Sequence, residues 1–163
     1  GSREISFQRE LDITRDYLAL QKLRYGASYE DEYEIDERAL EVQVPKLILQ
    51  PLVENSIYHG VRPKGELCVI RVTAKMLEDG LHVSVYDTGV GMGEEQIRKI
   101  LNHELADKNK QDVDMSKGGF GLVGTIDRIR YYCNRNDVVQ IRSEEGEFTE
   151  IEFVLPREQQ EGF

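Results

Sequence analysis

The sequence predicts a two-layer α/β sandwich, in which helices cover one face of a mixed, mostly antiparallel sheet, preceded by an N-terminal helix. Two pairs of β-rich runs carry this prediction. Residues 67–76 and 81–86 are separated by Glu78-Asp79-Gly80, and residues 138–142 and 148–155 are separated by Glu144-Glu145-Gly146. Such turns between β-rich runs indicate antiparallel hairpins. With the segments of helical periodicity, the tally is about five strands and three or four helices, which one domain can hold.

The N-terminal part of the chain predicts one helix followed by one strand. Residues 4–24 place Phe7, Leu11 and Leu18 on one stripe, and Gly26 is suited to end the helix. Residues 29–35 alternate loosely and predict a strand. We divide the chain into the N-terminal helix at residues 1–26, the sandwich at 27–157 and a tail at 158–163.

Three further helices are expected. Pro45 is expected to open a helix over residues 46–59, which Gly60 and Pro63 end. Residues 94–101 predict a short helix, and residues 121–132 return to helical periodicity. Between these two, residues 102–118 are mostly polar, and this length without a periodic pattern favours a lid or a disordered segment.

Composition limits the ligands and partners. A net charge of −10 disfavours a nucleic-acid partner, and it also repels an anionic nucleotide. A phosphate site would therefore depend on backbone N–H groups, helix N-termini and a bridging Mg²⁺. The longest apolar runs are too short to span a bilayer, so we expect no direct membrane contact by this chain.

The first chemically informative run is LQPLVENSIYHG, residues 49–60. On a helix, Pro51, Asn55 and His59 share one face, apart from the face of Leu49, Leu52 and Val53 that packs in the core. An amide oxygen is a ligand for a hard cation, and an imidazole ring can lie against a base. The alternative for these polar residues is an ordinary solvated helix face.

The second run is VSVYDTGVGM, residues 83–92. A strand that ends at Asp87 places a carboxylate at the edge of the sheet, and Gly89 and Gly91 let backbone approach a ligand closely. A buried carboxylate needs donors, and the amino group of adenine is one. The alternative is a common Asp-Thr-Gly turn.

The third run is KGGFGLVG, residues 117–124, at the start of a helix. Free N–H groups and the helix dipole at this end suit an anionic phosphate. Gly119, Gly121 and Gly124 also match the dinucleotide fingerprint G-x-G-x-x-G. That interpretation is disfavoured, because the preceding residues are mostly polar rather than strand-like and the residue 20 positions after Gly119 is Val139 rather than an acid.

In this order and spacing, the three runs resemble the N, G1 and G2 boxes of the GHKL (Bergerat-type) nucleotide-binding superfamily. The string LQPLVENSIYHG, preceded by YLALQKLRYG, is similar to the LytS-type sensor histidine kinases in particular. The resemblance extends over residues 10–156. It implies a domain that binds ATP and Mg²⁺.

The resemblance also implies roles for individual residues. Asn55 would ligate Mg²⁺, and Asp87 would accept from the adenine amine. Gly89, Gly91 and Met92 would form the wall behind the base, with His59 and Thr149 beside the nucleotide. Gly119, Gly121 and Leu122 would begin the helix that meets the phosphates, and Lys117 in the lid would contact them.

Four positions bear on catalysis. Tyr58 replaces a common Lys or Arg, and Gly124 replaces the usual Asn of the G2 box. Pro51 stands where the hydrolases of the superfamily carry a Glu that acts as the general base. Because Pro51 cannot activate water, the resemblance favours phosphotransfer over hydrolysis. Glu54 is a weaker candidate for a base, because it lies about 100° away from Asn55 on a helix.

The resemblance implies a histidine kinase whose phosphoacceptor histidine lies upstream of residue 4. None of His59, His82 and His103 has the neighbours of such an acceptor, so we expect this chain alone to be inactive. The parent protein would be a membrane-anchored homodimer with this domain in the cytoplasm. The domain would phosphorylate the parent's own phosphoacceptor domain, and the phosphate would then pass to a response regulator. The alternative is a GHKL module that senses nucleotide or binds partners without catalysis.

Overall fold

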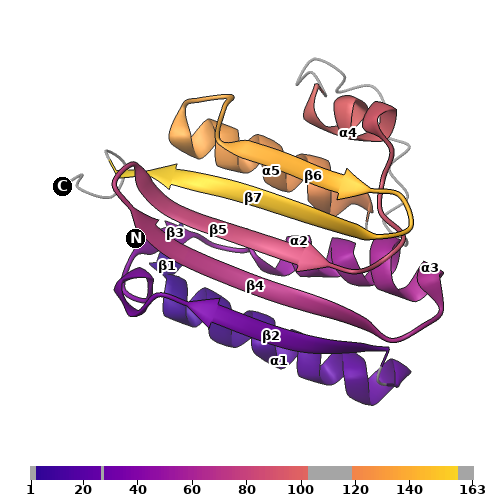
Figure 1. The fold of residues 1–163 in the computed structure, drawn as a ribbon. Helices are drawn as coiled ribbons and strands as arrows, with labels where there is room; N and C mark the ends of the chain where they lie inside the picture. The colour runs from indigo at the N-terminus through magenta and orange to yellow at the C-terminus, as the bar shows by residue number, and fades with distance from the viewer. Residues whose placement is uncertain (1–2, 27, 103–118, 158–163) are drawn as a thin grey trace.

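A computed structural model of the chain shows a twisted sheet with helices on one face (Figure 1). It describes residues 3–26, 28–102 and 119–157. Within these ranges the main sheet has five strands in the order β2-β4-β5-β7-β6. Their bounds are Tyr29–Ile35 for β2, Cys68–Leu77 for β4, Gly80–Asp87 for β5, Val139–Glu144 for β6 and Phe148–Pro156 for β7.

The pairing of these strands is antiparallel except at one edge. β4 with β5, β5 with β7, and β6 with β7 all run antiparallel, whereas β2 runs parallel to β4, from Tyr29 beside Cys68 to Ile35 beside Ala74. A parallel pair needs a long crossover, and the chain between β2 and β4 supplies it. The predicted mixed, mostly antiparallel sheet with helices on one face is confirmed.

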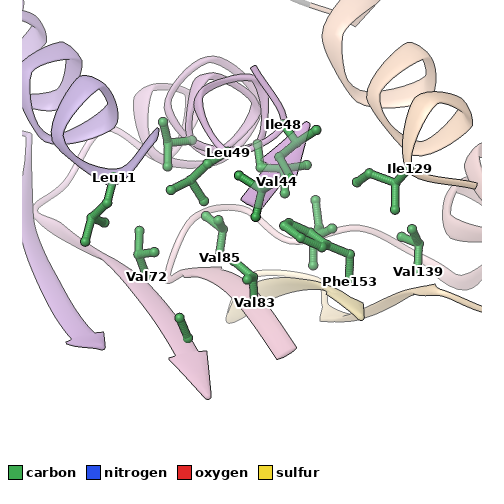
Figure 2. Packing of buried hydrophobic residues seen from close by; sticks show 14 of the residues in the cluster. Leu11, Val44, Ile48, Leu49, Val72, Val83, Val85, Ile129, Val139 and Phe153 are labelled. Atoms are coloured by element: carbon green, nitrogen blue, oxygen red, sulfur yellow. The ribbon is translucent and has the colours of Figure 1, made fainter. Parts of the chain in front are cut away.

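The helices that cover the sheet are α1 (Phe7–Tyr25), α2 (Gln50–Asn55) and α5 (Gly119–Cys133), while α4 (Glu94–Leu101) lies beyond β6 (Figure 1). Figure 2 shows the core between the two layers, where Val72, Val83 and Phe153 of the sheet meet Leu11 and Ile129 of the helices. The alternation of side chains along a strand sends polar residues to the other face of the sheet. No helix among the described residues is long and apolar enough to cross a membrane.

The N-terminal helix begins later than predicted. Residues Glu4–Ser6 form strand β1, which pairs antiparallel with β3 (Gln43–Pro45) in a separate two-stranded sheet. The helix starts at Phe7 because the Ser6 hydroxyl accepts the N–H of Arg9 at 3.2 Å and caps it. The apolar pattern of residues 4–24 did not indicate this pairing. The pairing joins residues 4–6 to residues 43–45, which precede α2.

The helix predicted over residues 46–59 was wrong at both ends. Pro45 ends β3, and helical structure begins only at Gln50. At the other end, α2 continues as a π-helical turn, Ser56–Val61, and then as α3, Arg62–Lys64. Pro63 falls in the first turn of α3, where a missing N–H is tolerated, and Gly65 ends the helix with φ 72°.

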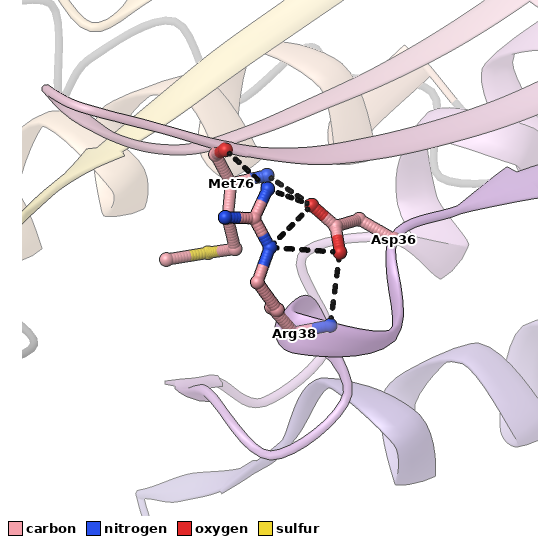
Figure 3. A network of polar contacts seen from close by, with 3 residues as sticks. All are labelled: Asp36, Arg38 and Met76. Carbon is pink, nitrogen blue, oxygen red and sulfur yellow. Dashed lines mark hydrogen bonds and ion pairs between the residues drawn. The ribbon is translucent and has the colours of Figure 1, made fainter.

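A polar network fixes the end of β2 to β4 (Figure 3). Asp36 accepts the N–H groups of Arg38 and Met76 at 3.0 and 3.2 Å, and the Arg38 guanidinium donates to Asp36 and to the Met76 carbonyl. Hydrogen bonds from Arg38 hold the pKa of Asp36 well below its usual range. The short 3₁₀ helix Glu37–Ala39 begins at this cap.

The remaining predicted elements agree with the structure to within about two residues. Gly80 is a strand residue rather than a turn residue, since Leu77 pairs with it. The predicted lid at 102–118 lies outside the described residues except for Asn102, which follows α4. The predicted tail at 158–163 lies entirely outside them.

Candidate nucleotide-binding site

Asp87 is a buried carboxylate at the end of β5. It follows Leu81, Val83 and Val85 on the helix-facing side of the strand, and it is 1% exposed. The Gly89 N–H donates to its Oδ1 at 2.9 Å, and the Ser56 hydroxyl also bonds to it. Burial raises the pKa of Asp87 to about 6, against the opposing effects of these two bonds and of Lys64. A carboxylate in this position is suited to accept a further hydrogen bond.

Two glycines bring backbone against this carboxylate. A Cβ at Gly60 would lie 2.7 Å from Asp87 Oδ1, and a Cβ at Gly89 would lie 2.3 Å from the carbonyl carbon of Gly60. The Val90 N–H also donates to the Gly60 carbonyl at 3.1 Å. The π-helical turn therefore packs directly on the loop after β5, and neither glycine leaves room for a side chain.

The loop after β5 is anchored to the β6–β7 hairpin. Gly91 has φ 72°, and a Cβ there would lie 2.1 Å from the Glu144 carbonyl oxygen, so only glycine fits. The Met92 N–H donates to Ser143 Oγ at 2.7 Å, and Ser143 Oγ lies 2.9 Å from the Thr149 hydroxyl. Thr149 is 5% exposed and stands opposite Asp87 in the β5–β7 register. Asp87, Met92 and Thr149 are thus brought together.

Asn55 lies at the end of α2 and is 7% exposed. Its side chain carries an amide oxygen, which is a ligand type that a hard cation accepts. No group of three or more His, Cys, Asp or Glu side chains among the described residues could hold a metal ion. The single amide oxygen of Asn55 would fit a Mg²⁺ that takes one protein oxygen and completes its shell with water and phosphate oxygens.

The start of α5 lies beside α2. A Cβ at Gly121 would be 3.4 Å from the Pro51 Cβ, and Leu122 is buried in the core. The N-terminal end of α5, which begins at Gly119, is therefore close to the helix that carries Asn55. Lys117 lies outside the described residues.

His59 and Glu54 are placed less centrally. His59 is exposed, and the wider winding from Ser56 onward means that its position relative to Asn55 does not follow α-helical spacing. Glu54 accepts a hydrogen bond from Gln50 at 2.9 Å and lies near Tyr17 of α1. Tyr58 also bonds to Tyr17, so this side of the helix faces α1 rather than Asp87.

Three contributors were not assigned by sequence reasoning. The sequence predicts no role in the site for Ser56 or Ser143, and it predicts only a helix end for Gly60. The sequence signal that could have identified Gly60 as a site residue is its position as the last residue of the LQPLVENSIYHG string. Ser143 could not have been found, because its role depends on the register of β6 with β7.

A buried strand-end carboxylate under glycine backbone, with a helix N-terminus beside a buried amide, is the arrangement expected of a nucleotide-binding α/β sandwich. Residues 41–159 match the family of histidine kinase-, DNA gyrase B- and HSP90-like ATPases. The chain belongs to this family.

Two similar proteins are named as a sensor protein and a sensor histidine kinase. The sensor protein LytS of Bacillus anthracis is 31% identical over 160 residues, which are 96% of this chain and 26% of that protein. The sensor histidine kinase YpdA of Escherichia coli (strain K12) is 29% identical over 155 residues, 95% of this chain and 25% of that protein. The chain thus spans about a quarter of the length of these relatives.

Solved histidine kinases share the fold. The catalytic domain of ThkA superposes with a TM-score of 0.62 at 17% identity, over 94% of this chain and 97% of that one. Full-length ShkA in complex with AMPPNP gives a TM-score of 0.64 at 19% identity, over 93% of this chain and 30% of that one.

Proposed function

We propose that this domain binds Mg·ATP and donates its γ-phosphoryl group to a histidine that lies outside this chain. The observation that carries the proposal is Asp87, a buried carboxylate held between Gly60 and Gly89 with the capacity to accept one more donor. The adenine amine is such a donor. Met92 and Thr149 are the neighbours that would contact the base from the hairpin side.

The phosphates would extend from Asp87 along the helix toward Asn55. The Asn55 amide oxygen would hold Mg²⁺, which neutralises phosphate charge when bound. Gly119 and Gly121 would offer backbone N–H groups at the start of α5. The chain carries a net charge of −10, so its overall field repels a polyanion such as ATP. Hydrogen bonds from these backbone N–H groups would offset that repulsion at the phosphates.

Transfer to a histidine fits this geometry better than hydrolysis. Pro51 packs beside Gly121 and cannot activate water, and Glu54 faces α1. Phosphoryl transfer depends mainly on positioning and charge neutralisation. His82 is a poor acceptor, since it lies on the opposite sheet face and contacts Asp79 at 2.6 Å.

For the whole protein we propose a membrane-anchored sensor kinase homodimer, with this domain in the cytoplasm. It would phosphorylate its own phosphoacceptor domain, which then passes phosphate to a response regulator. The similarity to LytS and YpdA supports this reading. The competing function is a module that binds ATP without transferring phosphate. Two residues favour it: Tyr58, which packs against α1 and replaces a common Lys or Arg, and Gly124, which replaces the usual Asn of the G2 box.

The metal assignment is tested with Asn55→Ala. We expect calorimetry to show a loss of about 1–2 kcal/mol in AMPPNP binding with Mg²⁺ present, and little loss in EDTA, since the amide acts through the metal. Asp127→Ala on α5 serves as a control of unchanged affinity. An equal loss in both buffers would contradict the metal role.

A further inference from the structure

Glu10 is a fully buried carboxylate on α1 that takes no part in the site described above. It is 0% exposed, and its Oε2 accepts the N–H of Leu47 at 3.1 Å. The N–H groups of Ile48 and Leu49 bond to the same carboxylate. Burial raises its pKa in spite of these bonds, and its Oε1 has no partner among the described residues. A buried acid of this kind needs a reason to be retained.

The segment that Glu10 holds has a strained backbone. Leu47 has φ 58°, which a non-glycine residue rarely adopts. On its other side, Arg128 of α5 donates from Nη1 to the Leu47 carbonyl at 2.8 Å and from Nη2 to the Lys46 carbonyl. Both backbone polar groups of Leu47 are therefore bound by side chains, one from α1 and the other from α5. We call Glu10, Leu47 and Arg128 the clamp.

The clamp sits at the start of the helix that carries Asn55. The Leu49 carbonyl accepts the N–H groups of Leu52 and Val53 at 3.1 and 3.2 Å, so the first helical turn follows directly from the held segment. The N–H groups that Glu10 accepts belong to the residues just before this turn, where helix donors lack helical partners. Pro51 in the same turn packs on Gly121 of α5. The clamp thus fixes how Asn55 and the N-terminus of α5 are placed relative to each other.

We propose that Glu10 is a positioning residue for the phosphate and metal end of the nucleotide site, acting from α1 through the backbone of residues 47–49. The inference rests on the proposed function. It makes the position of α1 a determinant of how Asn55 meets Mg·ATP, whereas the adenine end at Asp87 is held separately by Gly60, Gly89 and the β6–β7 hairpin.

The test compares two ligands in calorimetry, AMPPNP with Mg²⁺ and adenosine, on the unmodified chain and on variants. Glu10→Ala is expected to weaken AMPPNP binding by about tenfold, which corresponds to about 1.4 kcal/mol, and adenosine binding by less than about twofold. Glu10→Gln should recover most of the loss, because its amide oxygen can still accept an N–H. Asp16→Ala, an exposed acid on the same helix, should change neither affinity.

Arg128→Ala provides a second variant in case Glu10→Ala does not fold, since Arg128 is exposed and holds the same segment. It should show the same selective loss. Equal weakening of both ligands, or a fall in melting temperature with AMPPNP affinity retained, would assign Glu10 a structural role only and overturn the inference. If the unmodified chain bound neither ligand, the proposed function itself would be overturned, and the inference with it.

Discussion

On the proposed function, Asp87 is the residue on which recognition of adenine would depend most. Its carboxylate already accepts from Gly89 and Ser56, and the adenine amine would be a third donor. Asparagine offers one acceptor oxygen and an NH₂ group that can only donate, so at least one of these donors would be mispaired. We therefore expect Asp87→Asn to weaken adenosine and AMPPNP binding by about 1–3 kcal/mol near neutral pH, as measured by calorimetry.

The same prediction has a pH dependence with a definite sign. Because burial raises the pKa of Asp87 to about 6, the free protein holds this group protonated at lower pH. The ionised form is the better acceptor, so affinity for adenosine should fall by about tenfold between about pH 7 and about pH 5. Asp87→Asn cannot titrate and should lose this dependence. Unchanged affinity in the variant, or an equal fall with pH in both proteins, would remove Asp87 from the adenine site.

At the scale of elements, glycines in two settings should respond oppositely to alanine. Gly124 lies within α5, and an added Cβ would have no described atom within 4 Å beyond its own turn of helix, so Gly124→Ala should stabilise the fold by about 0.5–1 kcal/mol through helix propensity. Gly89→Ala would force a Cβ to within 2.3 Å of Gly60 backbone, and it should destabilise by about 1–3 kcal/mol. Urea unfolding measures both. A destabilised Gly124→Ala, or a Gly89→Ala of unchanged stability, would contradict the packing described.

The strands could be predicted from sequence because their signal is local. Alternation and turn residues placed each strand of the main sheet to within about two residues. The helix around Asn55 could not be bounded in this way. Its start is delayed by a left-handed Leu47 that Glu10 and Arg128 hold from distant parts of the chain, and its end is extended by a π-helical turn. Strands β1 and β3 were too short to give a pattern.

The candidate site was foreseen to a different extent. Its chemically distinctive residues, Asn55 and Asp87 with the glycines after it, came from motif spacing and family resemblance. The structure brings Asp87, Met92 and Thr149 together through the β5–β7 register and through Ser143. The role of Ser143 and the contact of Gly60 with Asp87 arise only when the layers pack, so no local pattern could reveal them.

For the whole molecule, the two ends of the proposed nucleotide site are held by different parts of the fold. The adenine end is built by β5, the π-helical turn and the β6–β7 hairpin, whereas the phosphate end depends on α2 and α5, with α1 connected through Glu10. On the proposed function, we expect ATP binding to need only this domain and transfer to need in addition an acceptor histidine from outside the chain.

The central claim is tested most directly by incubating the chain with γ-labelled ATP and Mg²⁺, alone and together with a separate segment of the protein that carries the acceptor histidine. We expect acid-labile label on the supplied segment, none on the chain itself and little release of phosphate. Label on the chain would mean that one of its own histidines is the acceptor, and rapid phosphate release would indicate an ATPase. ATP binding without any transfer to the supplied segment would contradict the kinase account and favour the non-catalytic module.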